Sequence, residues 1–147
     1  QADSFERLIS LCEILNIHTL TCEEISEEYA FDLRQADYYT NAGRYLALVD
    51  KVTTDDSSPH FSLTSKGKRI MRLNYKERQL AFCRSVLEHK IFAKVFERCM
   101  MIGKIPSNQE IVDMMHNSQL YNMASESTYK RRSSTVKAWI SWMLELL

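Results

Sequence analysis

The chain has 147 residues, of which 45% are hydrophobic and 26% charged, a composition typical of a folded globular protein rather than a disordered one. Only three glycines and two prolines are present, which favours helices over a many-turned β-sandwich. No apolar run approaches the roughly 20 residues of a membrane span, so we expect a cytoplasmic protein with no membrane contact. Because the chain begins with Gln1, we also expect it to be a piece of a longer protein.

Charge is divided unevenly along the chain, although the formal net charge is zero. Residues 1–50 hold 3 basic and 10 acidic side chains, a net charge of −7, and residues 51–147 hold 16 basic and 9 acidic ones, a net charge of +7. A basic second part suggests an anionic partner such as nucleic acid.

Cysteine and histidine spacing gives no sign of a metal site. The four cysteines form no C-x-x-C pair, and the four histidines have no recognised ligand spacing. We therefore expect no metal site and no cofactor in this chain, and we interpret the cysteines as thiols in a reducing cytoplasm.

In the first half, apolar residues at helical spacing predict a helix over residues 2–16. Thr21 and Asp32 each precede a Glu or Gln by three residues, which predicts capping boxes at the start of a second and a third helix. Residues 48–53 and 60–64 are typical of two strands around a turn at 55–59, and Ser65 is expected to cap a helix that ends near residue 74. Three helices followed by a hairpin is the element order of a winged helix.

In the second half, residues 76–101 keep helical spacing with a break near His89 and Lys90. Ser107 is expected to cap a further helix, and a polar loop over residues 117–125 leads to a last helix over 127–147. The segments 21–25 and 107–111 share the order hydroxyl cap, two spacers, Glu and Ile, which indicates a short internal repeat, with chance similarity between amphipathic helices as the alternative. The expected fold class is therefore mainly α with a small β-hairpin wing, as tandem helix-turn-helix units over residues 1–75 and 76–147.

Two of the expected helices carry side chains suited to reading DNA. Arg can form two hydrogen bonds with guanine, and Asn or Gln can do so with adenine. On the third helix we expect the outward residues to be Arg34, Gln35, Asp37, Tyr38, Thr40, Asn41 and Arg44. On the last helix we expect Ser127, Thr128, Tyr129, Lys130, Arg131, Arg132, Ser134, Thr135 and Lys137. Phosphate contacts are expected from Lys66, Lys68 and Arg69, with His60 of the wing and Arg72 nearby. The alternative interpretation of each set is a solvated helix face.

Motifs of catalysis are absent from the sequence. It has no phosphate-binding G-x-x-x-x-G-K-[ST] loop, no G-x-S-x-G nucleophile elbow and no H-E-x-x-H zinc motif. Asp55 and Asp56 form an acidic pair, but they lie in an expected turn without an acidic-x-Lys partner on a strand, so a nuclease site here is the least favoured alternative. We expect no catalytic centre.

Several segments resemble a winged-helix module of bacterial type II restriction endonucleases and restriction-associated proteins. These segments are RQADYYTNA at 34–42, YLALV at 45–49, FSLTSKGK at 61–68, ERQL at 77–80 and STYKRRSSTV at 127–136, followed by Trp139 and Ile140. The resemblance implies sequence-specific double-stranded DNA binding as a target-recognition module, with a nuclease domain elsewhere in the same full-length protein. The alternatives are a winged-helix transcriptional regulator and a winged-helix protein-interaction module, and the latter predicts a large exposed apolar patch instead of a basic face.

Overall fold

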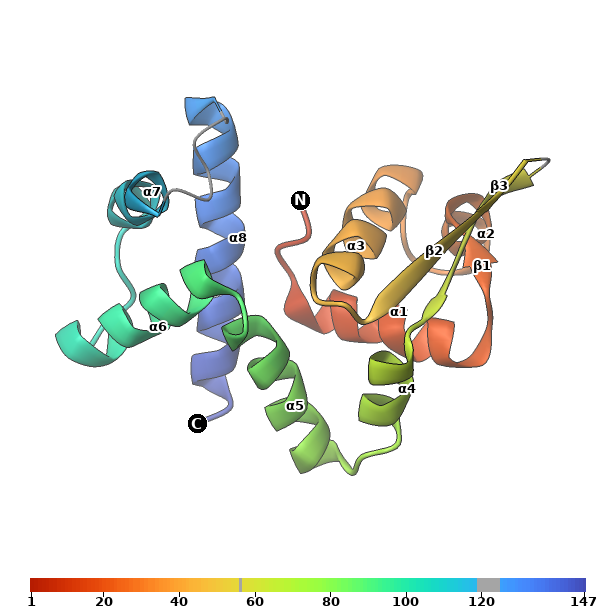
Figure 1. Ribbon diagram of the computed structural model, residues 1–147, viewed down its shortest axis with the longest axis horizontal. Helices are drawn as coiled ribbons and strands as arrows, with labels where there is room; N and C mark the ends of the chain where they lie inside the picture. The colour runs from red at the N-terminus through yellow and green to blue at the C-terminus, as the bar shows by residue number, and fades with distance from the viewer. Residues whose placement is uncertain (56, 119–124) are drawn as a thin grey trace. The chain divides into compact units, whose positions relative to one another are not determined.

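The computed structural model describes residues 1–55, 57–118 and 125–147, and it is mainly helical with a small antiparallel sheet. The chain divides into two compact units, Gln1–Ala81 and Phe82–Leu147 (Figure 1). The boundary between the units lies within helix α5 (Tyr75–Leu87), and the boundary expected between residues 75 and 76 lies at the start of the same helix.

The first unit contains four complete helices and three strands among its described residues. The helices are α1 (Phe5–Ile17), α2 (Cys22–Glu28), α3 (Leu33–Tyr45) and α4 (Ser65–Met71), and the strands are β1 (Leu20–Thr21), β2 (Val49–Thr54) and β3 (Ser57–Leu63). The strand order is β1-β3-β2, with every pair antiparallel. The β2–β3 hairpin extends beyond the helices of this unit (Figure 1).

The two predicted capping boxes are confirmed. Thr21 accepts a hydrogen bond from the Glu24 N–H at 3.1 Å, and the Glu24 carboxylate accepts one from the Thr21 N–H at 2.9 Å. Asp32 and Gln35 make the same reciprocal pair at 2.7 and 3.1 Å. Both boxes satisfy N–H groups that the first helical turn would otherwise leave without a partner, so they set where α2 and α3 begin.

The hairpin and the helix after it differ from the prediction. β3 begins at Ser57, so the predicted turn at 55–59 is wrong in its second half. Pro59 has no N–H to donate, and the pairing of β2 with β3 shifts register between Val52 and Thr54, which lets the strand pass the proline. Thr64, not Ser65, caps α4 by accepting from the Gly67 N–H at 3.0 Å, and α4 ends at Met71.

Close packing around glycines fixes α3 and α4 against the sheet. A Cβ at Gly43 of α3 would collide with Cγ2 of Val49 at the start of β2. A Cβ at Gly67 of α4 would lie 2.5 Å from the carbonyl oxygen of Leu48. At these glycines α3 and α4 therefore lie closer to residues 48 and 49 than a residue with a side chain would allow.

The second unit contains the end of α5 and three further helices, α6 (Lys90–Ile102), α7 (Asn108–Asn117) and α8 (Glu126–Glu145). The predicted break near His89 is confirmed, and Ser107 caps α7 as predicted. Gly103 ends α6 in the left-handed conformation, with φ of 73°. Most of the predicted loop at 117–125 lies outside the described residues. α6, α7 and α8 pack on one another, with Phe92 of α6 stacked on Trp139 of α8 at a ring distance of 5.2 Å (Figure 1).

Candidate nucleic-acid interface

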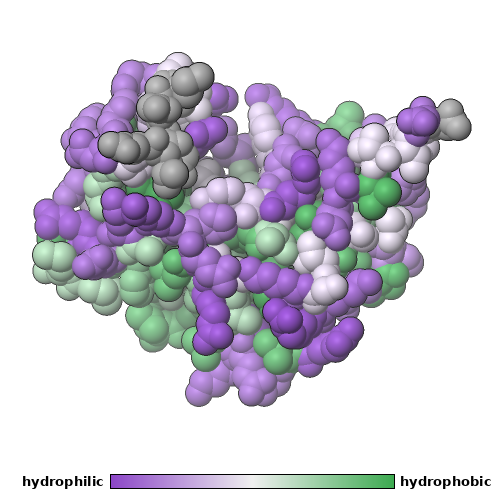
Figure 2. Space-filling model, viewed as in Figure 1, coloured by the Kyte–Doolittle hydropathy of each residue, from purple (hydrophilic) through white to green (hydrophobic). Residues whose placement is uncertain are grey.

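The outer face of α3 presents polar side chains to solvent. Arg34, Asp37, Asn41 and Arg44 are exposed, and Tyr38 is half-buried among them. Figure 2 shows hydrophilic residues over α3 in this view. These positions recur every three or four residues, so they share one face of the helix.

Arg34 and Tyr38 form a pair on this face. The Arg34 Nε–H donates to the Tyr38 hydroxyl at 2.8 Å, and the guanidinium carbon lies 5.5 Å from the centre of the Tyr38 ring. Donating this hydrogen bond to the hydroxyl raises the pKa of Arg34 above its usual value. The pair holds a long, exposed side chain in one position.

Two side chains expected on this outer face instead make hydrogen bonds within the first unit. Gln35 accepts from the Asp32 N–H in the capping box and from Arg7 of α1 at 3.3 Å. Thr40 is fully buried and donates to the Asp37 carbonyl at 3.0 Å, so its expected outward position is wrong. Helix periodicity explains the error, because Thr40 lies four residues after Ala36 and three before Gly43, which both face the core.

The first half of α8 presents a basic surface. Lys130, Arg131 and Arg132 are exposed, and Lys137 is half-buried. Arg131 donates to the Thr128 hydroxyl at 3.2 Å, which orients its guanidinium along the helix. In the part of the chain that the structure describes, no carboxylate lies within ion-pair distance of Lys130, Arg131 or Lys137.

Not every residue expected on α8 faces solvent. Tyr129 is 2% exposed and lies against His116 of α7 at a ring distance of 4.0 Å, so its expected outward position is wrong. It belongs to the inner stripe with Ser133 and Val136, at helical spacing.

The hydroxyls on α8 are largely engaged by the helix itself. Ser134 donates to the Lys130 carbonyl at 3.3 Å, and Thr135 donates to the Arg131 carbonyl at 3.4 Å. Ser127 lies 3.0 Å from the hydroxyl of Ser125, which caps the helix. The cations, more than the hydroxyls, therefore define what this surface can bind.

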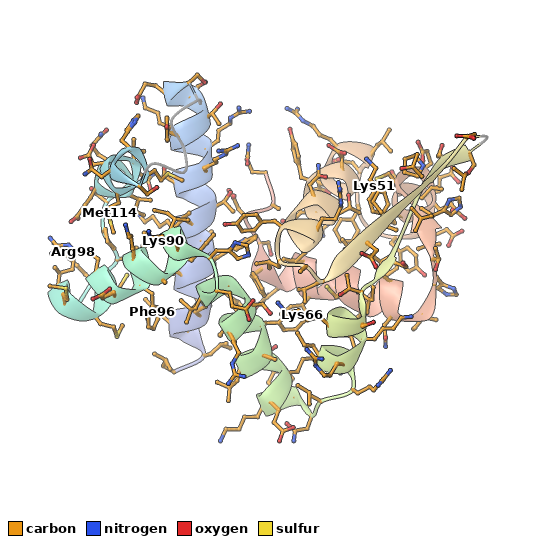
Figure 3. All side chains as sticks on the ribbon, viewed as in Figure 1. Lys51, Lys66, Lys90, Phe96, Arg98 and Met114 are labelled. Carbon is orange, nitrogen blue, oxygen red and sulfur yellow. The ribbon has the colours of Figure 1, made fainter. Side chains whose placement is uncertain are left out.

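The acidic residue at the start of α8 is paired. Glu126 lies 2.9 Å from Nε2 of His116 and so holds the end of α7 to the start of α8. A second pair, Arg98 of α6 (labelled in Figure 3) with Glu110 of α7 at 2.8 Å, links α6 to α7. These contacts place α6 and α7 behind the basic surface without neutralising it.

Around α4 the predicted cations are only partly available. Lys68, Arg69 and Arg72 are exposed, but Lys66 is half-buried and donates to the carbonyl of Leu46, at the end of α3, at 3.3 Å. Lys66 therefore has a structural role at the C-terminal end of α3, where a cation is stabilised by the helix dipole.

The hairpin contributes one cation that sequence analysis missed. Lys51 of β2 is exposed and lies close enough to Cys22, at the start of α2, to offset part of the rise in that thiol's pKa that burial causes (Figure 3). His60, the predicted wing residue, is half-buried near Glu24 and helps to lower the pKa of that carboxyl, after the larger effect of hydrogen bonds from Thr21. No alternation marks Lys51, because every residue of β2 after Val49 is exposed.

Helix α2 adds negative charge beside α3. Glu23, Glu27 and Glu28 are exposed on it, and α2 packs directly against α3. The first unit thus combines a hydrogen-bonding face on α3 with an acidic neighbour, whereas α8 of the second unit is basic over its first turns.

Comparisons with known proteins give a family for the chain. None of the described helices is both long and apolar enough to cross a membrane. Neither a curated protein nor a solved structure matches the chain. The family model described as "Domain of unknown function (DUF7226)" matches residues 7–147, so the chain belongs to this family.

Proposed function

We propose that the chain binds double-stranded DNA, with α8 supplying most of the affinity through phosphate contacts and α3 supplying selectivity through base contacts. The observation that carries the proposal is the basic surface of α8: Lys130, Arg131, Arg132 and Lys137 lie within eight consecutive residues and include cations without a carboxylate partner in the described chain.

Helix stability does not account for these cations. The helix dipole acts mainly within the first and last turns, whereas these cations begin at the fifth residue of α8, so the dipole gives no reason for them. A phosphate backbone favours them, because each neutralised phosphate releases counterions and adds about 0.9 to the salt dependence of binding.

The order of elements in the first unit supports base reading by α3. α2 and α3 are joined by residues 29–32, a length that suits a helix-turn-helix, and the β2–β3 hairpin follows as a wing would. In that arrangement the N-terminal part of the second helix meets the edges of bases in the major groove. Arg34 and Asp37 occupy this part of α3 and are exposed.

The acidic face of α2 explains why we assign affinity to α8. Glu23, Glu27 and Glu28 would lie near the DNA backbone if α3 entered the groove, and like charges reduce the attraction. The first unit can then discriminate between bases but contributes little non-specific binding.

The resemblance to restriction endonucleases extends this proposal. It implies that the chain is the target-recognition module of a type II enzyme whose nuclease domain lies elsewhere in the full-length protein. A transcriptional regulator is the alternative within DNA binding, and it would bind a palindromic site as a dimer.

A second candidate is protein–protein interaction. It is favoured by the apolar residues that gather over α6 in Figure 2, where Met100 and Met101 are 55% and 72% exposed. Binding through such a surface depends little on salt and not on the cations of α8. Salt dependence therefore separates the two candidates.

The test is a salt titration of binding to a labelled duplex. The slope of log affinity against log salt is negative for binding through phosphates. Replacing all three of Lys130, Arg131 and Lys137 by Gln should make this slope shallower by about 2.7, which is three times 0.9. The matched control replaces three exposed lysines of the same unit by Gln and should leave the slope nearly unchanged; these are Lys90, Lys94 and Lys104. Equal effects in both variants, or no binding by the native chain at low salt, would contradict the proposal.

A further inference from the structure

The exposed pair on α3 has a geometry suited to one base. The Nε–H of Arg34 donates a hydrogen bond to the Tyr38 hydroxyl, and the ring of Tyr38 lies beside the guanidinium. The two terminal NH₂ groups of Arg34 remain, side by side at the end of the side chain. Two parallel N–H donors of this kind match the O6 and N7 acceptors of guanine in the major groove.

We propose that Arg34 reads a guanine through its two terminal NH₂ groups and that Tyr38 is a positioning residue that holds Arg34 for this contact. The inference rests on the proposed DNA binding and deepens it, because it names the base and the atoms that are read.

The position of Arg34 in α3 supports this role. It is the second residue of the helix after the Asp32 cap, and the N-terminal residues of a recognition helix are those that reach base edges. A cation there is disfavoured by the helix dipole, so helix stability alone gives no reason for it. Arg34 is exposed and has no described ion pair within the unit.

Restricting the Arg34 side chain before binding strengthens its contact with a base. An exposed arginine that is free to move loses conformational entropy when it binds, which weakens the contact. The hydroxyl and ring of Tyr38 restrict the guanidinium before binding, so less is lost when it meets a base. Tyr38 is half-buried on the same face of α3, four residues on, and is therefore itself held by the fold.

The helix also predicts the spacing of a second contact. Asn41 is exposed seven residues after Arg34, which is about 10 Å along a helix axis. This distance corresponds to about three base-pair steps of 3.4 Å. Asn forms two hydrogen bonds with adenine, so a guanine and an adenine about three base pairs apart are expected in the preferred site.

The experiment is selection from random duplexes with the full chain, followed by affinity measurement on the selected site. Native protein should enrich a site with one strongly preferred guanine. Replacing that guanine with 7-deazaguanine, which lacks the N7 acceptor, should lower native affinity, and replacing it with another base should lower it about 5- to 150-fold.

Variants then assign the contact. Arg34→Ala should lose the preference for guanine at that position and keep the preferences at other positions. Tyr38→Phe retains the ring and removes only the hydroxyl, so it should reduce the penalty of 7-deazaguanine while leaving the salt slope unchanged. Arg84→Ala, which removes an exposed arginine of α5 outside the proposed interface, is the matched control and should keep the guanine preference. Circular dichroism verifies that each variant is folded.

The outcomes separate this inference from the proposed function. If a site is selected but Arg34→Ala retains its guanine, or if Tyr38→Phe has the native response to 7-deazaguanine, the assignment is overturned and DNA binding stands. Binding of DNA without any base preference also overturns it. If the native chain binds no duplex at low salt, the proposed function and the inference both fail.

Discussion

Replacing Gly67 with Ala should destabilise the first unit, because the new methyl group would meet backbone. An added Cβ would lie 2.5 Å from the Leu48 carbonyl oxygen and 3.3 Å from Cβ of Leu63. The same carbonyl accepts from the Thr64 N–H at 2.9 Å, so moving it away weakens the start of α4. Overpacking costs about 1–3 kcal/mol and the hydrogen bond about 1 kcal/mol, while Ala gains about 0.5–1 kcal/mol over Gly in a helix. The net loss is about 2 kcal/mol.

Urea unfolding followed by circular dichroism measures this loss. With a denaturant slope of about 1–3 kcal/mol per molar, the midpoint should fall by about 1 M. Ser65→Ala, at an exposed position of the same helix, is the control and should change the free energy of unfolding by less than about 0.5 kcal/mol. If Gly67→Ala were as stable as the native chain, the close approach of α4 to Leu48 would be refuted.

Three further predictions concern a thiol, a capping carboxylate and the core of the second unit. Burial raises the pKa of Cys12 to about 12, so at pH 8 iodoacetamide should label it far more slowly in the folded chain than in urea, and equal rates by mass spectrometry would contradict this. The pKa of Glu24 is lowered, first by the hydrogen bond from the Thr21 backbone, so its contribution to stability is present above the unfolded pKa of about 4.3 and is lost as pH falls through the folded pKa. Glu24→Gln keeps a capping acceptor, and the stability difference from the native chain should shrink between neutral and acidic pH in urea titrations; a constant difference would argue against the capping contact. Phe92→Ala removes the ring stacked on Trp139 and should cost about 3–5 kcal/mol with a red shift of tryptophan fluorescence, whereas a loss below 1 kcal/mol would show that this stack lies outside the core.

Local signals in the sequence predicted the starts of α2, α3 and α7, whereas the starts of α1 and α4 were displaced. The capping boxes at Thr21 and Asp32 depend on residues only three apart, so the sequence contains both partners of each hydrogen bond. Strand β1 was missed because it is two residues long and exists only through pairing with β3, as in Leu20 opposite Phe61. Nothing within residues 20–21 themselves distinguishes them from loop.

Sequence analysis predicted which charged side chains are exposed, but it was less accurate about which uncharged side chains face outward. Exposed cations such as Arg34 and Arg131 are found from composition, because charged side chains are rarely buried without a partner. Thr40 and Tyr129 were assigned to the wrong side, since which face of a helix is buried depends on the elements that pack on it. Their helical spacing from other buried residues, such as Ala36 and Val136, was the signal that could have placed them.

The measurement that tests the central claim most directly is a nuclear magnetic resonance titration of the labelled chain with a short duplex at low salt. DNA binding through α8 and α3 predicts shifts of backbone amides concentrated around Lys130 and Arg131 and around Arg34 and Asn41, reversed by added salt. Amides of α6, where the apolar residues gather, should stay in place. An unchanged spectrum at saturating duplex, or shifts confined to α6, would contradict the account.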